Sequence, residues 1–376
     1  MRILLVSHYT LPHYGGIEVV VENLAKGFVG RGHEVIVLSS RISGPACEIR
    51  HGFEVVRVPA WNVLESYAVP YPLFSPGLLM VARRLIRWAD IVHAHGFLYQ
   101  PTLVSLWLAR QARRPRVLTE HAGFVRYNRW FWNGIQFVAI QTLGRLAVAL
   151  ADAVIVVGTR TLSLGRRIAA PGKPVLLIPN GVDTQFFHPV SPEGKRRIRQ
   201  SLGWDERPKV LSVGRLVPRK GIDLLLEARE HRYDLVLCGR GDTPLPEGEG
   251  LLVYRSPDDM QLRRIYQAAD IYVLPSHSEG AFPLTAQEAM ACGLPVIALP
   301  DPTYLTYVTP EVVQFVQPSA EALRNAILSL VYNQEERQRR SQISAEWART
   351  HFSWERTVEA HLTLYESLRV GGTHGS

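Results

Sequence analysis

The sequence of 376 residues has few of the features that mark secreted or membrane-embedded chains. Its three cysteines are an odd number and widely spaced, so we expect no disulfide framework and predict that Cys238 and Cys292 are buried free thiols in a reducing compartment. No apolar run reaches the ~20 residues that a membrane-spanning helix needs. Residues 2–7 have the pattern of a strand rather than of a secretory signal, so we expect a cytoplasmic protein.

The chain also lacks an even distribution of charge. Residues 1–180 contain 20 Lys and Arg against 9 Asp and Glu, a net charge of +11, and residues 181–376 contain 22 against 25, a net charge of −3. A basic first half indicates an anionic partner. Because no nucleic-acid-binding motif is present, we expect no nucleic acid and favour an anionic membrane surface, at the inner face of the membrane, or a phosphorylated acceptor.

Short apolar runs alternate with amphipathic stretches, which is typical of parallel α/β proteins. The first unit has a predicted strand at 3–6, a helix at 17–28 and a strand at 33–40, with Gly15 and Gly16 in the first loop. This order is the repeating unit of a doubly wound parallel sheet. The loop lacks the dinucleotide fingerprint GxGxxG, so the two glycines indicate either a phosphate contact or only a tight turn.

Two histidines stand at the ends of predicted strands in the first half. The strands cover 90–95 and 117–119, and His95 and His121 lie at or just past their carboxyl ends. Ligands collect at the carboxyl ends of parallel strands, so both histidines are candidate site residues. We favour a functional role for His121, which precedes a break in regularity, and a structural role for His93.

Two stretches of the first half have unusual compositions. Residues 59–76 are rich in proline and aromatic residues and are predicted to form a long loop, a feature that is usually functional. Residues 124–151 begin with arginines mixed with Trp130, Phe131 and Trp132 and continue as an apolar helix. This pattern indicates a membrane interface or a lipid-bearing acceptor, and equally a core helix whose flanking aromatic residues pack between domains.

A turn cluster and an aperiodic stretch at 179–192 divide the chain. We place a linker here, between a first domain over 1–180 and a second over 181–352, with a final helix over 353–376 that packs back towards the first domain. The predicted fold class is α/β, with two Rossmann-like doubly wound parallel-sheet domains facing across a cleft.

The second half contains a basic strand-to-helix junction. After a predicted strand at 209–213, three cations that include Arg215 and Lys220 lie between Gly214 and Gly221. The glycines would hold the backbone close to a ligand, so the cations are well placed for a diphosphate. A solvated basic loop is the alternative.

The stretch 276–298 contains a second predicted anion site. Pro283 suits a first helical turn, and the next three amides would point out of the helix start. Glu288, within two turns of that start, has a carboxylate that can accept two hydroxyl hydrogen bonds from a sugar ring. The three amides at the helix start belong to Leu284, Thr285 and Ala286. A phosphate at these amides and a sugar at the carboxylate would together form a nucleotide-sugar site.

Seven segments, in this order, resemble a retaining glycosyltransferase of the large nucleotide-sugar-dependent family with the GT-B fold, glycosyltransferase family 4 (glycosyl transferases group 1). Each segment alone is a weak signal, whereas the order of all seven is a strong one, and the resemblance covers nearly the whole chain. The segments are GGIEVVVENLAKGFVGRGHEV, DIVHAH, LTEH, IPNGVDTQFFHP, VGRLVPRKGID, AADIYVLPS and SEGAFPLTAQEAMACGLPVIA.

The resemblance implies roles in both domains. Gly15 and Gly16 would line the cleft near the donor phosphates and the acceptor. His121 would lie close to the reacting sugar and act in catalysis. Arg215 and Lys220 would grip the diphosphate and stabilise it during the reaction.

The resemblance also assigns the two glutamates of the family's E-x7-E motif. Glu279 would be the first, a catalytic residue beside the donor sugar, and Glu288 the second, on the ribose hydroxyls. Phe282, Leu284 and Thr285 would complete the donor site. Eight residues separate the two glutamates instead of seven. With Ala281 as the extra residue in a bulge before Pro283, Glu279 would be shifted and Glu288 would keep its place.

The implied reaction transfers a hexose from a UDP- or GDP-sugar to a hydroxyl of a glycan or lipid-linked acceptor. The acceptor would attack from the face that the diphosphate leaves, so the configuration is retained, and cations and amides would stabilise the departing charge. Asp258 and Asp259 have the pattern of a helix cap rather than of a metal-binding pair, so we expect no essential metal, and no cofactor besides the donor. Closure of the cleft about the linker is expected to assemble the site.

Two other hypotheses remain open. One is a sugar-nucleotide epimerase or a phosphorylase on the same fold, although neither a convergent acid–base pair nor a pyridoxal-binding lysine is evident. The other is a catalytically impaired nucleotide-sugar-binding or membrane-docking protein, which the altered glutamate spacing allows. The family's helix after Gly241 is replaced by a short stretch at 243–250, which leaves the choice between uracil and guanine open.

Overall fold

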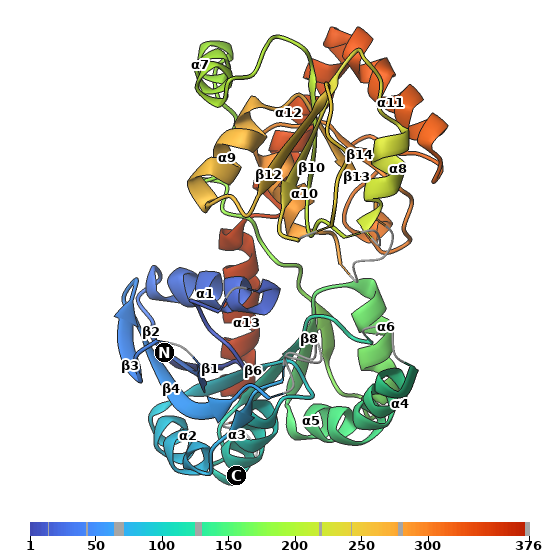
Figure 1. Cartoon of the computed structure of the whole chain (residues 1–376). Coiled ribbons are helices and arrows are strands. Elements are labelled where there is room, and N and C mark those ends of the chain that lie inside the picture. Colours follow the sequence, from blue (N-terminus) through green and yellow to red (C-terminus); the bar gives the residue numbers. More distant parts are fainter. Residues whose placement is uncertain are drawn as a thin grey trace. The chain divides into compact units, whose positions relative to one another are not determined.

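A computed structural model describes residues 1–13, 15–42, 44–63, 71–124, 130–217, 220–241, 243–276 and 281–372. The chain folds into two compact units (Figure 1). The first consists of Met1–Asn180 together with Trp354–Ser376, and the second of Gly181–Ser353. Each unit has its own sheet and hydrophobic core.

The first unit is built on a sheet of nine strands among the described residues. Eight of them have the order β3-β4-β2-β1-β6-β7-β8-β9, and the ninth, β5, pairs with β4. β3 and β5 pair antiparallel with β4, and the pairings from β4 to β9 are parallel. The strands are β1 (Arg2–Val6), β2 (Glu34–Arg41), β3 (Cys47–Arg50), β4 (Phe53–Trp61), β5 (Leu73–Phe74), β6 (Ile91–His95), β7 (Arg116–Glu120), β8 (Ala153–Val156) and β9 (Val175–Leu177).

Helices cover both faces of this sheet (Figure 1). Alternate residues of one strand therefore enter different cores: Ile3 packs with the helices of one face and Leu4 with those of the other. Burial on both faces explains why the strands are continuous apolar runs. One face carries α1 (Gly16–Val29) and α13 (Trp354–Gly372), and the other α2 (Gly77–Trp88), α3 (Gln100–Gln111), α4 (Trp130–Ala139), the π-helix Ile140–Gly144, α5 (Arg145–Leu150) and α6 (Thr159–Ile168).

α13 brings the end of the chain into the core of the first unit. Its Val358 and Tyr365 are fully buried against Phe28 of α1 and the adjacent strands. A Cβ atom added at Gly27 of α1 would lie 2.3 Å from Cγ2 of Val358. Glycine at this position therefore allows α1 and α13 to approach closely, and the last helix becomes part of the first unit.

The second unit has a six-stranded parallel sheet with the order β12-β11-β10-β13-β14-β15. Its strands are β10 (Lys209–Val213), β11 (Asp234–Gly239), β12 (Leu251–Arg255), β13 (Ile271–Leu274), β14 (Val296–Ala298) and β15 (Val313–Phe315). Its helices are α7 (Pro192–Leu202), α8 (Ile222–Glu227), α9 (Asp259–Ala268), α10 (Leu284–Ala291), the 3-10 helix Tyr304–Thr306, α11 (Ala320–Tyr332) and α12 (Gln334–His351).

Local signals set the helix boundaries of this unit. Asp258 accepts a hydrogen bond from the amide of Gln261 at 2.7 Å, which confirms its predicted role as a cap of α9. Ser191 caps α7 in the same way through the amide of Gly194. Because Asp258 serves the helix start, the acidic pair there has a structural explanation.

Several elements differ from the sequence-based expectations. Residues 59–76 are not one loop, because β4 continues to Trp61 and β5 pairs with it through Ala60 and Phe74; residues 64–70 lie outside the described chain. β3, β15, α3, α6 and α7 were not predicted. In the stretch 124–151, the π-helix and α5 pack in the core, while much of α4 is exposed.

Candidate functional site

The backbone after β10 runs beside the backbone after β11. The amide of Gly214 donates to the carbonyl of Cys238 at 2.9 Å, and that of Leu216 to the carbonyl of Arg240 at 2.7 Å. A Cβ atom at Gly239 would lie 1.7 Å from the carbonyl oxygen of Gly214, so only glycine fits between these segments. The two extended backbones hold the base of the predicted diphosphate loop in place.

Arg215 and Lys220 both lie in the connection from β10 to α8. Arg215 is exposed and Lys220 is half-buried, while Pro218 and Arg219 lie outside the described chain. Gly221 has a φ of +75°, and a Cβ atom there would lie 2.2 Å from the carbonyl oxygen of Pro275. Since Pro275 directly follows β13, the loop that carries the two cations is pressed against the end of the neighbouring strand.

α10 starts one residue later than expected, with Pro283 as its N-cap. The carbonyl of Pro283 accepts hydrogen bonds from the amides of Ala286 and Gln287, both at 3.1 Å. The prediction that the amide of Ala286 is free is therefore wrong. Within the described chain, the amides of Leu284 and Thr285 have no protein acceptor, so these two remain to bind an anion.

Glu288 of α10 is held by a tyrosine of α9. The hydroxyl of Tyr266 donates to Oε2 of Glu288 at 2.8 Å, and its oxygen also lies 3.0 Å from the carbonyl oxygen of Thr285. Burial raises the pKa of Glu288 to about 7, against which the hydrogen bond from Tyr266 acts in the opposite direction. The carboxylate is thus oriented by a fixed donor and poised between its charged and neutral forms near neutral pH.

A second tyrosine fixes the start of α10. Tyr272 of β13 donates through its hydroxyl to Oγ1 of Thr285 at 3.0 Å. The sequence did not point to Tyr266 or Tyr272, because both occupy apolar positions of regular elements and are fully buried.

The structure does not support a donor contact through the side chain of Phe282. Its ring is only 3% exposed and lies 5.5 Å from the ring of Phe352 and 5.6 Å from that of Tyr304. These contacts direct the ring into the core of the second unit. Glu279 lies within residues 277–280, outside the described chain, so its predicted position beside the sugar stays a prediction.

His121 follows β7 in the first unit and is paired with His95 at the end of β6. Their Nε2 and Nδ1 atoms, respectively, are 3.0 Å apart. Burial lowers the pKa of His121 to about 3, so this imidazole is neutral at physiological pH. His93 is fully buried between Tyr365 and Thr119, with both ring nitrogens at 2.6 Å from their hydroxyls, which confirms its structural role.

The loop that carries His121 is fixed by Glu120, a residue that the sequence analysis did not single out. Its carboxylate accepts hydrogen bonds from the amides of Ala122 at 3.0 Å, Gly123 at 2.9 Å and Phe97 at 3.1 Å. A carboxylate bound by three amides satisfies its buried oxygens and rigidifies the backbone on both sides of His121.

Gly15 and Gly16 begin α1, but a carboxylate of the chain already lies at this helix start. A Cβ atom at Gly15 would be 2.4 Å from Oε2 of Glu18, and Oε1 of Glu18 lies 3.1 Å from Nδ1 of His13. Glu18 is almost fully buried, and burial raises its pKa. The close contact at Gly15 is thus made by the carboxylate of Glu18; a Cβ atom at Gly16 would meet no neighbour within 4 Å.

Stacked rings line the carboxyl edge of the first sheet. His8 stacks on Tyr99 at 3.7 Å between ring centroids, and Tyr9 stacks on His13 at 3.8 Å. The hydroxyl of Tyr9 donates to the side chain of Asn62 at 2.5 Å. Together with His121, this edge is rich in aromatic rings, whereas the corresponding edge of the second sheet carries the cations.

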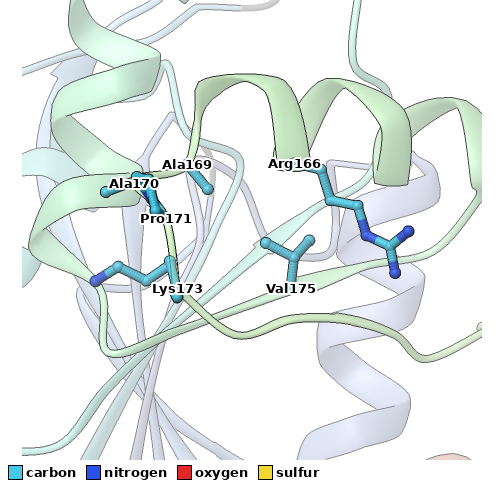
Figure 2. A pocket seen from close by; sticks show the side chains of 7 residues that line it. Arg166, Ala169, Ala170, Pro171, Lys173 and Val175 are labelled. Carbon is cyan, nitrogen blue, oxygen red and sulfur yellow. The ribbon is translucent and has the colours of Figure 1, made fainter.

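The hollow shown in Figure 2 lies elsewhere. It has a volume of 420 Å³ and is formed by the end of α6 and the start of β9, with Arg166 and Lys173 on its rim. Because β9 begins here, the hollow is at the amino ends of the strands. It is therefore separate from the carboxyl edge on which the candidate residues of the first unit lie.

The described residues offer neither a metal site nor a membrane-spanning helix. They contain no group of three or more His, Cys, Asp or Glu side chains arranged to hold a metal ion. No helix among them is long and apolar enough to cross a membrane.

Both halves of the chain match family models of glycosyltransferases. Residues 14–186 match the family model described as Glycosyltransferase Family 4, and residues 194–347 match that of Glycosyl transferases group 1. The chain is 30% identical to the D-inositol 3-phosphate glycosyltransferase of Saccharomonospora viridis, over 97% of this chain and 93% of the relative.

Two further similarities cover most of the chain. A GDP-mannose-dependent alpha-(1-6)-phosphatidylinositol monomannoside mannosyltransferase of Mycolicibacterium smegmatis is 29% identical over 78% of this chain and 79% of the relative. Among solved structures, Anabaena HepE in complex with UDP superposes with a TM-score of 0.75 at 20% identity, over 98% of this chain and 100% of that chain. The structural likeness shows the fold.

Proposed function

Because this chain belongs to glycosyltransferase family 4 and has the GT-B fold, we propose that it transfers a hexose from a UDP- or GDP-sugar to an acceptor hydroxyl with retention of configuration. One observation carries the proposal. In the second unit, Arg215 and Lys220 follow β10, next to β13, while α10 offers two amides and the oriented carboxylate of Glu288. Such a set suits a diphosphate and a pair of sugar hydroxyls.

The leaving diphosphate gains negative charge as the bond between the sugar and its phosphate oxygen breaks. Arg215, Lys220 and the amides of Leu284 and Thr285 would stabilise this charge more strongly in the transition state than in the bound donor. The acceptor oxygen bonds to the sugar carbon on the same face, and its proton passes to the departing phosphate oxygen. The step needs no protein nucleophile, and since cations and amides neutralise the diphosphate, we propose that it needs no metal and no cofactor.

Glu288 would bind the donor ribose. A deprotonated carboxylate can accept hydrogen bonds from both ribose hydroxyls, whereas its protonated form loses one acceptor site. Tyr266 occupies one lone pair of Oε2 and orients the rest of the group. This role predicts that donor binding strengthens as the pH rises through about 7, the pKa of the buried carboxyl.

His121 would contact the donor sugar as a neutral hydrogen-bonding group. Its Nε2 atom is engaged with His95, so Nδ1 is the atom left for a ligand. Because the pKa of His121 is low, protonating it would require acid well below neutral pH, and a cationic role is not proposed. Its pairing with His95 would set the tautomer.

We further propose a glycan or lipid-linked acceptor. The names of two relatives specify inositol 3-phosphate and a phosphatidylinositol monomannoside, both polyols that carry phosphate. The basic first unit and its edge of stacked rings suit an acceptor of this kind, since aromatic faces pack on sugar rings and cations attract phosphate. We also propose that this unit contacts an anionic membrane.

A donor screen tests the proposal most directly. The purified protein is heated with UDP- and GDP-sugars, and a true donor at 100 times its dissociation constant should add about 2.7 kcal/mol of stability. The stabilising sugar is then incubated with inositol phosphates and phosphatidylinositol vesicles, with and without EDTA, and the anomeric configuration of the product is read by NMR. A product with inverted configuration, or activity lost with EDTA, would contradict the retaining, metal-independent mechanism.

The same assay separates the competing hypotheses. A sugar-nucleotide epimerase would release an altered nucleotide sugar without any acceptor. An inactive binding protein would be stabilised by the donor but would neither hydrolyse nor transfer it.

A further inference from the structure

Four helices and a π-helix of the first unit form a continuous layer that we call the basic face. It consists of α2, α3, α4, the π-helix Ile140–Gly144 and α5, which lie on the same side of the sheet (Figure 1). The segment 77–151, from which this layer is built, contains ten arginines, no lysine and two acidic residues, a net charge of +8. That equals the net charge of the whole chain.

Neither acidic residue reduces the positive charge at the surface of this layer. Asp90 accepts hydrogen bonds from the backbone amide and the guanidinium of Arg2 at 2.8 and 2.9 Å. Glu120 is buried and bound by backbone amides, as described above. The exposed charged side chains of the described part of this layer are therefore all arginines, and they include Arg83, Arg84, Arg87, Arg110 and Arg145.

The helices that carry these arginines are fixed to one another. The guanidinium of Arg114, just after α3, donates to the carbonyl of Arg87 at the end of α2 at 2.9 Å. α2 packs along α3, and α3 along α5. The positive charges thus belong to one rigid surface rather than to separate mobile segments.

Next to these charges, α4 exposes an apolar stripe. Phe131, Ile135 and Val138, spaced four and three residues apart, lie on one face of the helix and are 37%, 54% and 59% exposed. Beyond the π-helix, Leu146 of α5 is also 49% exposed. Exposed apolar side chains grouped in this way are uncommon on a surface that faces only water.

We propose that the basic face docks on an anionic lipid bilayer, with the apolar stripe at the boundary between headgroups and acyl chains and the arginines on lipid phosphates. This proposal rests on the proposed function, since it would bring a lipid-linked acceptor to the first unit. The combination of an apolar helix face and adjoining cations is what an interfacial helix requires. A second copy of the chain fits poorly, because a symmetric contact would place two surfaces of the same charge against each other.

Vesicle flotation tests the proposal with the full chain. Phosphatidylcholine vesicles containing about 30% phosphatidylglycerol should bind the protein, and pure phosphatidylcholine vesicles should bind it much less. Replacing Arg83→Glu and Arg87→Glu together should lower binding at least about 30-fold, since each arginine near an anionic surface contributes about five-fold. Salt of about 1 M, where charges are screened beyond ~3 Å, should remove this part of the binding.

The apolar stripe is tested separately. Ile135→Ser with Val138→Ser should lower binding by about ten-fold or more, because burial of apolar area no longer contributes. Matched controls lie in the second unit: Arg196→Glu with Arg197→Glu on α7 and Met260→Ser on α9 alter exposed residues of the same kinds. These should leave vesicle binding unchanged.

Three outcomes would overturn the proposal. They are equal binding to neutral and anionic vesicles, equal loss in the control variants, or a stable dimer in light scattering that Ile135→Ser with Val138→Ser converts to a monomer. Hydrolysis of the nucleotide sugar without acceptor is measured in parallel and should be unchanged in all variants. If hydrolysis is absent from every protein while flotation behaves as expected, the proposed function fails and the docking surface stands.

Discussion

The carboxyl edges of the two sheets use the same strand-loop-helix design for different chemistry. In the second unit, two amides at the start of α10 have no acceptor among the described residues, and they lie beside a loop that carries Arg215 and Lys220. In the first unit, the carboxylate of Glu18 covers the start of α1, and the surrounding edge holds stacked histidine and tyrosine rings. A helix start attracts anions in general. Whether it is available to a ligand depends on whether the chain supplies its own anion.

Because the cations lie at the carboxyl edge of the second sheet, we expect substitutions of these cations to lower the rate of transfer most. Lys220→Ala should lower kcat/KM for transfer by about 100- to 1000-fold, because it removes a charge that stabilises the leaving diphosphate. Arg215→Ala should have an effect of similar size. The control is Arg196→Ala, an exposed arginine of α7 in the same unit, which should leave the rate unchanged. Equal rates for Lys220→Ala and the control would remove the basis for placing the diphosphate here.

Glu288→Gln should raise KM for the donor by about 10- to 100-fold, since the amide offers fewer acceptor sites to the ribose hydroxyls. In the parent protein, donor KM should rise as the pH falls through about 7, and this dependence should disappear in the variant. Steady-state kinetics between pH 6 and 8, a window of about one unit on either side of that pKa, provide the measurement. A pH dependence that survives in Glu288→Gln would assign the titration to another group.

The same substitution should affect stability in the opposite direction. Burial raises the pKa of Glu288 from 4.5 to about 7, so the folded state keeps a proton that the unfolded chain releases. Stability therefore falls as the pH rises between these two values. Urea unfolding should show Glu288→Gln more stable than the parent by about 1–2 kcal/mol at pH values above 7, with little difference near pH 4.5. A stabilisation that is the same at both pH values would contradict this origin.

Tyr266→Phe should have a smaller effect, of about three- to ten-fold on donor KM, because the carboxylate remains but loses the hydroxyl that orients it. Since that hydrogen bond lowers the pKa of Glu288, its loss should move the acidic limb of donor binding to higher pH. Tyr272→Phe provides a matched control, as its hydroxyl contacts Thr285 rather than Glu288. The shift should be seen with Tyr266→Phe alone.

A last prediction concerns the stability of the first unit. Gly15→Ala places a methyl group 2.4 Å from Oε2 of Glu18 and should lower the free energy of unfolding by about 1–2 kcal/mol. Glu18→Ala in the same chain removes the clash, so the two substitutions should be less than additive. Additive losses in a double-mutant cycle would mean that Glu18 does not occupy the start of α1.

Much of the architecture could be predicted because its signals are local. The family and the GT-B fold were predicted from ordered motifs and are confirmed, as is the assignment as a glycosyltransferase. The apolar runs of β1, β2 and β6 were recognisable because both faces of their sheet are covered. β3 and β5 were missed because they are short strands at or near the sheet edge, with too few residues to show a period.

The candidate site could be predicted only in part, for a physical reason. Arg215, Lys220 and Glu288 could be proposed as site residues from the sequence, because they lie close in sequence to glycines or a proline that shape the backbone. The burial of the Phe282 ring could not be predicted, since it depends on Phe352, seventy positions later. The π-helix within 124–151 was missed because it changes the helical register without changing composition.

The fold class, the family and the loops that carry the principal charges could be predicted before folding was considered, because they depend on periodicity and on short motifs. Which groups those charges meet depends on how the chain folds. Tyr266 reaches Glu288 from another helix, and Glu18 turns back over Gly15. Such contacts depend on the packing of whole elements, and packing determines both the distances between side chains and the burial that shifts the pKa of Glu288 and His121.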